Sequence, residues 1–365
     1  MAKIEFKQIA HAYGTNPKTP ADYALKGIHN VWQDGGAYAL LGPSGCGKTT
    51  LLNVISGLIT PSQGQVFFDD QEVTHLMPEK RNIAQVFQFP VLYDTMSVFN
   101  NLAFPLRNRG FNEVDVKARV SEVADILDLT PFLSKRAAGL AADAKQKISL
   151  GRGLVRRDVA AILFDEPLTV IDPNLKWQLR CKLKEIHEQL KLTFVYVTHD
   201  QVEALTFADQ VIVMYEGQIV QIGTPQELFE NPSHTFVGYF IGSPGMNFLP
   251  MVLENQMARV GNAAIFLGEK LASLAAKATG DLKLGIRPLY LEVHDSAVEN
   301  GVSARIKSVD DQGSFKILTA VLGDHLLWAR VPEGYPIPLE KVWLKFPISW
   351  IRLFSNDLLL TEKGE

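Results

Sequence analysis

The sequence of 365 residues is 47% hydrophobic and 21% charged, which is the composition of a globular protein long enough for two domains. The formal net charge of −4 argues against a nucleic-acid-binding protein, which is usually strongly basic. No apolar run reaches the roughly 18 residues of a membrane-spanning helix, and the first residues have no signal-peptide core. Only two cysteines occur, Cys46 and Cys181, and we therefore expect a protein of a reducing cytoplasm.

The first part of the chain alternates between strand-like and helix-like segments. Three short apolar runs, at Ala37–Leu41, Ala160–Phe164 and Phe194–Val197, have the character of buried parallel strands. Between about residues 92 and 154 the strand signals disappear, and apolar residues recur at helical spacing. We therefore predict an α/β domain over residues 1–242, with a helical subdomain at about 92–154 that interrupts its sheet.

A turn-rich stretch, Gly242-Ser243-Pro244-Gly245, ends this pattern. Beyond it, segments such as HLLWARV and KVWLKFPISWIRLF alternate polar and apolar residues in the manner of strands, with glycine and aspartate turns nearby. Residues 243–365 are therefore predicted to form a separate small all-β domain.

The most informative motif follows directly after the first buried run. Gly42-x-x-x-x-Gly47-Lys48-Thr49 is a complete phosphate-binding loop, preceded by a strand and followed by the helix-compatible TTLLNVISGL. Its glycines allow backbone N–H groups to surround the phosphates, while Lys48 reaches the β- and γ-phosphates and the Thr49 hydroxyl ligates Mg²⁺. The predicted nucleotide-binding residues of the loop are Gly42, Pro43, Ser44, Gly45, Cys46, Gly47, Lys48, Thr49 and Thr50.

A nucleotide hydrolase also needs a carboxylate for the metal and a base for the attacking water. The stretch AILFDEP supplies both at the end of the second apolar run, with Asp165 for the Mg²⁺ shell and Glu166 as general base. An apolar strand that ends in Asp-Glu is common by itself, so this assignment depends on the phosphate loop.

These motifs, in this order, resemble those of the ATP-binding subunits of ABC transporters, and the resemblance runs from Lys3 to the C-terminus. It implies a P-loop ABC ATPase domain, ATP hydrolysis, and the cofactors ATP and Mg²⁺. It further implies that Gln88 contacts Mg²⁺ and water, that His199 contacts the γ-phosphate, and that Tyr13 stacks on adenine. Thr169-Val170-Ile171-Asp172 matches the family's D-loop, which communicates across a dimer. The residues implied for the metal are Thr49, Gln88 and Asp165.

The family's signature, Leu-Ser-Gly-Gly-Gln, is altered in this chain. Its place is occupied by Leu140-Ala141-Ala142-Asp143-Ala144, in a register fixed by the following KQKISLGRGLVR. In a closed dimer this segment would cover the partner's ATP, yet Ala141 has no hydroxyl for the γ-phosphate and Asp143 adds bulk and negative charge. Two compatible interpretations remain, an N-cap role for Asp143 and a weakened site. We expect weakening, and hence pairing with a distinct ATPase subunit, with a homodimer as the alternative.

The C-terminal segments IGSPGMNFLP, LGIRP and VWLKFPISWIRLFS look like those of ATPases of maltose-type carbohydrate importers. This resemblance implies an OB-like regulatory domain of the MOP/TOBE type over residues 243–365. Arg287, within LGIRP, is expected to be a solvated arginine rather than a regulatory contact. The aromatic run FQFPVLYDTMSVFNNLAFPL around Gln88 is expected to supply both core residues and a groove for a coupling helix of the membrane subunit.

Cys46 carries an expectation about reactivity. It lies inside the phosphate loop beside backbone N–H groups and Lys48, which should favour its thiolate. We expect a thiol-alkylating reagent to inactivate the chain and Mg-ATP to protect it, the alternative being a thiol that turns into the helix and is inert.

The sequence as a whole predicts an ATP-hydrolysing subunit at the cytoplasmic face of a bacterial inner membrane, bound peripherally to permease subunits and served indirectly by a solute-binding protein. The run ALTFADQVIVMYEGQIVQIGTPQELF and the altered signature resemble ATPases of bacterial glycerol uptake systems, so the expected solute is glycerol or another polyol or sugar. Alternatives are an importer ATPase for spermidine, iron or phosphate, and a low-turnover regulatory nucleotide-binding subunit. An ABC protein of ribosomes or DNA is disfavoured, because the sequence has neither a second nucleotide domain nor a long coiled-coil insertion.

Overall fold

The computed structural model describes residues 2–169 and 171–361. The chain divides into two compact units, residues 1–225 and 226–365. Helices α7 (Pro225–Glu230) and α8 (Thr235–Phe240) thereby fall at the start of the second unit, upstream of the domain boundary that the sequence suggests at residue 242. That boundary, as a limit between independently folding domains, stays a prediction.

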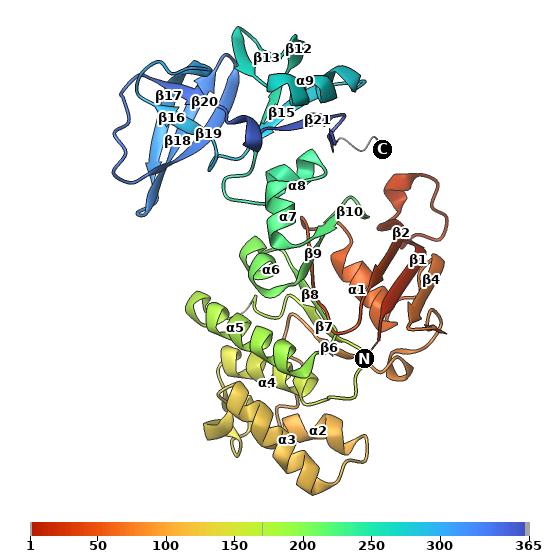
Figure 1. Ribbon diagram of the computed structural model, residues 1–365. Coiled ribbons are helices and arrows are strands. Elements are labelled where there is room, and N and C mark those ends of the chain that lie inside the picture. Colours follow the sequence, from red (N-terminus) through yellow and green to blue (C-terminus); the bar gives the residue numbers. More distant parts are fainter. Residues whose placement is uncertain (1, 170, 362–365) are drawn as a thin grey trace. The chain divides into compact units, whose positions relative to one another are not determined.

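A six-stranded sheet forms the centre of the first unit, in the order β10-β9-β3-β8-β7-β6 (Figure 1). The five strands from β9 to β6 are parallel, and β10 is antiparallel to β9. The three buried strands predicted from the sequence are confirmed as β3, β7 and β8. The strands are β3 (Ala37–Leu41), β6 (Ala84–Val86), β7 (Ile162–Asp165), β8 (Phe194–Thr198), β9 (Gln210–Tyr215) and β10 (Gln218–Gly223).

A second, antiparallel sheet, β2-β1-β4-β5, accompanies the first and was not evident in the sequence pattern. Helix α1 (Lys48–Ser56) shares one hydrophobic cluster with both sheets, in which Phe6 and Trp32 meet Leu51 and Leu163. Burial of such side chains stabilises the fold by about 25 cal/mol for each Å² of apolar surface removed from water. The strands are β1 (Ile4–His11), β2 (Leu25–Trp32), β4 (Gln63–Phe68) and β5 (Gln71–Glu72).

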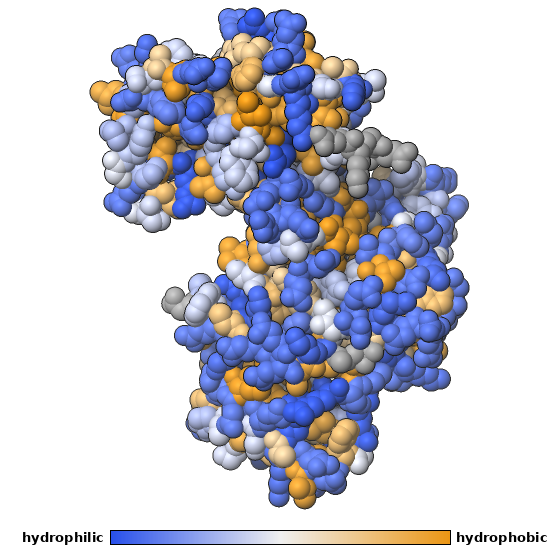
Figure 2. Space-filling view, viewed as in Figure 1, coloured by the Kyte–Doolittle hydropathy of each residue, from blue (hydrophilic) through white to orange (hydrophobic). Residues whose placement is uncertain are grey.

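The helical insertion predicted at about residues 92–154 is present. It consists of α2 (Val98–Arg107), α3 (Glu113–Ile126) and α4 (Ala142–Leu154). On the face shown in Figure 2, the region of α2 and α3 exposes hydrophobic residues among hydrophilic ones. Helices α5 (Pro173–Leu190) and α6 (Gln201–Phe207) complete the unit. In the described part of the chain, no helix has both the length and the apolar character needed to cross a bilayer.

The second unit is mainly β-structure, as predicted, and its described residues form three sheets in the orders β11-β15-β21-β22, β12-β13-β14 and β16-β20-β17-β18-β19. Helices α7 and α8 precede the range predicted to be all-β, residues 243–365, and helix α9 (Gly268–Lys277) is an addition to the strands within it. One hydrophobic core joins the three sheets, with Leu284, Val260 and Leu318 as members. The strands are β11 (Asn247–Pro250), β12 (Val252–Glu254), β13 (Met257–Val260), β14 (Ala263–Phe266), β15 (Leu282–Ile286), β16 (Glu292–His294), β17 (Gly301–Asp311), β18 (Phe315–Leu322), β19 (His325–Pro332), β20 (Lys341–Lys345), β21 (Arg352–Ser355) and β22 (Leu358–Leu359).

Arg287 is buried, and the prediction of a solvated arginine is wrong. Its side chain is only 1% exposed. Nε donates to the carbonyl of Phe229 at 2.9 Å, and Nη1 donates to the carbonyls of Gly238, at 2.7 Å, and Ile241. These carbonyls lie at or near the C-terminal ends of α7 and α8, where backbone acceptors lack helical partners. Burial lowers the pKa of Arg287 to about 10, so the guanidinium stays charged at neutral pH and links both helix ends to β15.

Candidate active site

The phosphate-binding loop connects the fully buried strand β3 to helix α1, which begins at Lys48. Gly47, the residue before the helix, has a φ of 102°, a conformation that favours glycine. A Cβ at Gly42 would lie 2.2 Å from the carbonyl oxygen of Met214, and one at Gly47 would lie 2.5 Å from that of Ala24. Both glycines are therefore required by space, and the loop they allow leads directly into the N-terminus of a helix.

Lys48 supplies a cation inside this loop. Its side chain is buried, and Nζ donates to the carbonyl oxygens of Gly42 at 2.8 Å and Pro43 at 3.0 Å. Within the described residues this ammonium has no carboxylate ion-pair partner, and its contacts are these two carbonyl oxygens and the Cys46 sulfur at 3.8 Å. A buried cation in this state is suited to an anionic group such as phosphate.

Two oxygen ligands for a cation lie beside the loop. The Thr49 hydroxyl donates to Oδ1 of Asp165 at 3.4 Å, which joins the start of α1 to the end of β7. Burial, and then the neighbouring charge of Glu166, raise the pKa of Asp165 above its usual value, against smaller opposing effects of Thr49 and Lys48. Nowhere in the described residues does a cluster of three or more His, Cys, Asp or Glu form a closed metal site. The arrangement suits Mg²⁺, which commonly uses one or two protein ligands together with phosphate oxygens.

The carboxylate of Glu166 lies at the centre of a polar cluster. His199 Nδ1 is 3.1 Å from Oε1 of Glu166, and the side-chain amide of Gln88 is 3.5 Å from Oε2. The Thr169 hydroxyl also approaches Oε2, at 3.3 Å. These residues follow β6, β7 and β8, whose carboxyl ends share one edge of the sheet. The structure therefore brings Gln88, Glu166 and His199 together; their catalytic roles stay predictions.

Glu166 has an unusual backbone conformation, with φ at 47°. Non-glycine residues seldom occupy this region, and strained positions of this kind are concentrated at functional sites. The backbone N–H of Glu166 donates to the carbonyl of Val197 at 3.0 Å, which ties the turn after β7 to the adjacent parallel strand β8. The contacts of Thr169 and this turn were not part of the predicted site, because no local sequence pattern indicates them.

Tyr13 lies next to the phosphate loop. Its side chain is 68% exposed, and its hydroxyl is 2.9 Å from that of Thr50 in α1. The His11 ring packs edge-on against the Tyr13 ring with centroids 4.8 Å apart. Ser62 accepts the N–H of Ala12 at 3.2 Å and lies 3.4 Å from Nδ1 of His11. His11 and Ser62, which the sequence did not single out, therefore support an open aromatic face beside the loop.

Cys46 is enclosed, and its surroundings oppose the thiolate that the sequence led us to expect. The side chain is 3% exposed and belongs to the hydrophobic cluster beneath α1. Burial raises the pKa of the Cys46 thiol, and Lys48, whose Nζ is 3.8 Å from Sγ, opposes this effect only in part. Desolvation of the thiolate therefore outweighs the nearby cation.

The altered signature forms the start of α4. Ala141 is the N-cap, and because it has no side-chain oxygen, no side-chain hydrogen bond caps the helix. Asp143 lies inside the first turn, so the N-cap role considered for it is wrong; its charge still interacts favourably with the helix N-terminus. One turn further, the Gln146 amide donates to the carbonyl of Pro167 at 2.7 Å and ties α4 to the residue after Glu166.

The segment matching the D-loop is described at Thr169, Ile171 and Asp172. Val170 lies outside the described residues. Ile171 is buried, and its N–H donates to the carbonyl of Leu168 at 3.1 Å in a tight turn after Glu166.

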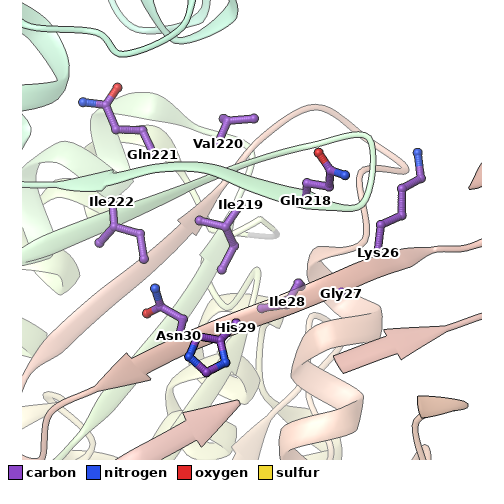
Figure 3. A pocket seen from close by; sticks show the side chains of 10 residues that line it. All are labelled: Lys26, Gly27, Ile28, His29, Asn30, Gln218, Ile219, Val220, Gln221 and Ile222. Carbon is purple, nitrogen blue, oxygen red and sulfur yellow. The ribbon is translucent and has the colours of Figure 1, made fainter. Parts of the chain in front are cut away.

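The first unit also has a pocket of about 510 Å³, which lies between β2 and β10 (Figure 3). Its lining comes from Lys26–Asn30 and Gln218–Ile222. Figure 3 shows Ile219 and Ile222 directed toward β2, whereas Val220 and Gln221 are directed away from it. None of the predicted nucleotide-site residues lines this pocket, which is therefore separate from the candidate site.

Comparisons with known proteins find relatives of both parts of the chain. The sequence model of a family described as ABC transporter matches residues 25–169, and that of the MalK OB fold domain matches residues 242–288. The chain is 38% identical to the sn-glycerol-3-phosphate import ATP-binding protein UgpC of Pectobacterium atrosepticum, over 89% of this chain and 90% of that protein. It is 37% identical to the protein of the same name from Yersinia pestis, over 98% of both chains.

Solved structures show the same fold. The chain matches cbiO1 of Clostridium perfringens, part of the ABC transporter complex cbiONQ, with a TM-score of 0.57 and 26% identity. The match covers 62% of this chain and 90% of that one. A dimeric ATP-binding cassette in a post-hydrolysis state with ADP and Pi matches with a TM-score of 0.54 and 24% identity, over 61% of this chain and 98% of that one, which supports the fold alone.

Proposed function

The chain belongs to the ABC transporter ATPase family, and on this premise we propose that it energises the import of glycerol or another polyol or sugar by hydrolysing ATP at the site described above. The observation that carries the proposal is the convergence of Lys48, the Thr49–Asp165 pair and Glu166 around the start of α1. Phosphate-binding, metal-binding and base groups are the parts that phosphoryl transfer requires.

Each group has a defined task in the proposed reaction. Lys48 pairs with the phosphates of ATP, and Glu166 accepts a proton as a water oxygen bonds to the γ-phosphorus and the bond to the β-phosphate oxygen breaks. His199, whose Nδ1 lies 3.1 Å from Oε1 of Glu166, donates toward the transferred phosphoryl group or orients the base. Mg²⁺, held by Thr49, Asp165 and Gln88, would neutralise charge on the phosphates. The products are ADP and phosphate.

The solute is inferred from relatives rather than from the site, because ATP hydrolysis does not involve the solute. The relatives named above are sn-glycerol-3-phosphate import proteins, which supports a glycerol-related or polyol solute for this chain. Spermidine, iron and phosphate are the alternative solutes that the sequence left open.

The partners follow from the family. An import ATPase works as a dimer with membrane permeases, and we propose that this chain binds them at the cytoplasmic face of the bacterial inner membrane. The exposed side chains of Phe89, Val91 and Tyr93, which follow Gln88 and are 41–69% exposed, are suited to receive a helix from a permease. A solute-binding protein would act indirectly, on the other side of the membrane.

A distinct second ATPase is the proposed dimer partner. The segment Ala141–Asp143 offers no hydroxyl at the N-terminus of α4 and adds a carboxylate there, which would repel a γ-phosphate. In a heterodimer the ATP of this chain would be covered by the partner's signature instead. A homodimer and a low-turnover regulatory subunit are the two alternatives.

The proposal is tested by solute uptake in cells that lack this chain. Complementation with the wild type should restore ATP-dependent uptake of labelled glycerol, and Glu166→Gln should not. Labelled sn-glycerol 3-phosphate, maltose and spermidine serve as the competing solutes. Restored uptake of one of these alone would replace the solute assignment, and unchanged uptake of every solute would contradict the transport role.

A further inference from the structure

The second unit contains a cavity of about 680 Å³ that no part of the proposed mechanism uses. It lies among the β13–β14 turn, the start of β17, the β18–β19 turn and β20. The side chains that give it chemical character are those of Asn262, Ser303, Asp324, His325 and Trp343.

The strand register explains why these side chains meet. Ser303 of β17 pairs with Trp343 of β20, and Leu322 pairs with His325 across the β18–β19 turn. Neighbours of Ser303 and Trp343 along each strand, such as Val302 and Leu344, are buried in the core. Because side chains alternate between the two faces of a strand, Ser303 and Trp343 lie on the opposite face, away from that core.

The two turns at the rim leave room for a ligand. Gly261 and Gly323 have φ angles of 56° and 60°, and a Cβ at either position would meet no atom within 4 Å. The rim is therefore made of tight turns with open space above them, and the adjacent Asn262 and Asp324 are exposed.

The polar side chains of this cavity are unpaired in the described part of the chain. Among the described residues, the side chains of Asn262, Ser303, Asp324, His325 and Trp343 make no hydrogen bond or ion pair with the protein. They offer hydrogen-bond donors from an amide, a hydroxyl, an imidazole and an indole, and acceptors that include one carboxylate. The lining contains no lysine or arginine.

This combination selects one class of ligand. A phosphate or carboxylate would meet the charge of Asp324 with no lysine or arginine in the lining, and a simple cation would leave the donor groups unused. A molecule with several hydroxyl groups both donates and accepts, and its C–H surface packs on an indole ring. We propose that this cavity is a binding site for a small neutral polyol or sugar.

The test uses the full chain labelled with fluorotryptophan and followed by ¹⁹F NMR. The chain has five tryptophans, and Trp343→Phe assigns the signal of the cavity, with Trp177→Phe as an exposed control in α5. Glycerol, sorbitol and maltose are the neutral probes; sn-glycerol 3-phosphate and spermidine are the charged ones. At least one neutral probe should shift the Trp343 signal with saturation.

The variant Asp324→Asn should weaken that binding roughly 10-fold, as expected for loss of a hydrogen bond to a charged group. Asp295→Asn, in another exposed turn of the same unit, should leave it unchanged. The proposal is overturned if no neutral probe gives a saturable shift, if only a charged probe does, or if Asp324→Asn has no effect. None of these outcomes depends on ATP hydrolysis or on the identity of the transported solute.

Discussion

The two surfaces that an ABC dimer brings to ATP are very differently equipped in this chain. The surface around Gly42–Thr50 has a buried lysine, a threonine–aspartate pair and a glutamate in contact with His199. The surface at Ala141–Asp143 presents a helix start with no side-chain cap and an added carboxylate. From this difference we expect that the chain hydrolyses ATP at its own site but covers the ATP of a dimer partner poorly.

The largest expected effect concerns the well-equipped surface. Glu166→Gln keeps the size of the side chain and removes the base, so hydrolysis at this site should fall about 10²- to 10⁴-fold while ATP binding persists. Steady-state phosphate release and equilibrium ATP binding are the two measurements. Glu188→Gln, exposed on α5, is the matched control. Full turnover of Glu166→Gln in a transporter whose second site is inactivated would remove Glu166 from the role of base.

Lys48→Ala should act on binding rather than on chemistry. The described residues give the ammonium two carbonyl oxygens and one sulfur as partners and no carboxylate, so it can pair with ground-state phosphates. Loss of a charged hydrogen bond costs about 1.5–3 kcal/mol, so ATP affinity should fall roughly 10- to 150-fold. Titration with a fluorescent ATP analogue measures the ATP affinity, and Lys184→Ala, at an exposed lysine of α5, is the control. Unchanged affinity would mean that the loop binds phosphate without this lysine.

Asp165→Asn should stabilise the nucleotide-free chain although it impairs the site. Burial and the charge of Glu166 raise the pKa of Asp165 in the folded chain. At a pH above that raised pKa, the charged carboxylate therefore lowers the free energy of unfolding. The variant should melt about 2–4 °C higher at neutral pH, if the charge costs about 1 kcal/mol. The difference from wild type should shrink as the pH falls toward the ordinary pKa of aspartate. A melting temperature that is lower at pH 7.5 would show that the Thr49 contact outweighs desolvation.

The smallest expected effect is the chemical modification of Cys46. Since the thiol is buried and its pKa is raised, N-ethylmaleimide should modify Cys46 much more slowly than Cys181, with or without ATP. Peptide mass spectrometry at timed intervals distinguishes the two cysteines, and Cys46→Ser confirms the assignment. Fast labelling of Cys46 that ATP prevents would restore the reactive thiol that the sequence suggested.

The sequence was most informative where function depends on residues close together in the chain. The phosphate loop and the pair Asp165-Glu166 were predictable because a tight turn and a strand end constrain residue types at fixed spacing. The strands β3 and β8 followed from short continuous apolar runs, and the helical insertion followed from apolar residues at helical spacing.

What the sequence could not supply depends on contacts between distant segments. The burial of Arg287 is set by carbonyls of Phe229 and Gly238, which no local pattern around LGIRP indicates. The environment of Cys46 is set by the core beneath α1. Ser62, which holds the segment next to Tyr13 through Ala12 and His11, lies 50 residues from Ala12 along the chain. The antiparallel sheet β2-β1-β4-β5 was not predicted, because its strands pair with bulges and shifted registers, which blur the alternating pattern of polar and apolar residues.

The central claim is that the two surfaces differ in competence, and ATP hydrolysis by the purified chain alone tests it most directly. Loss of one preorganised contact to a transition-state phosphate costs about 10²- to 10³-fold in rate. We expect the chain alone to bind ATP and hydrolyse it very slowly, and the repaired variant carrying Ala141→Ser, Ala142→Gly and Asp143→Gly to be at least about 10-fold faster. Fast, cooperative hydrolysis by the unmodified chain, with no gain on repair, would contradict the account and show that the altered segment is competent as it stands.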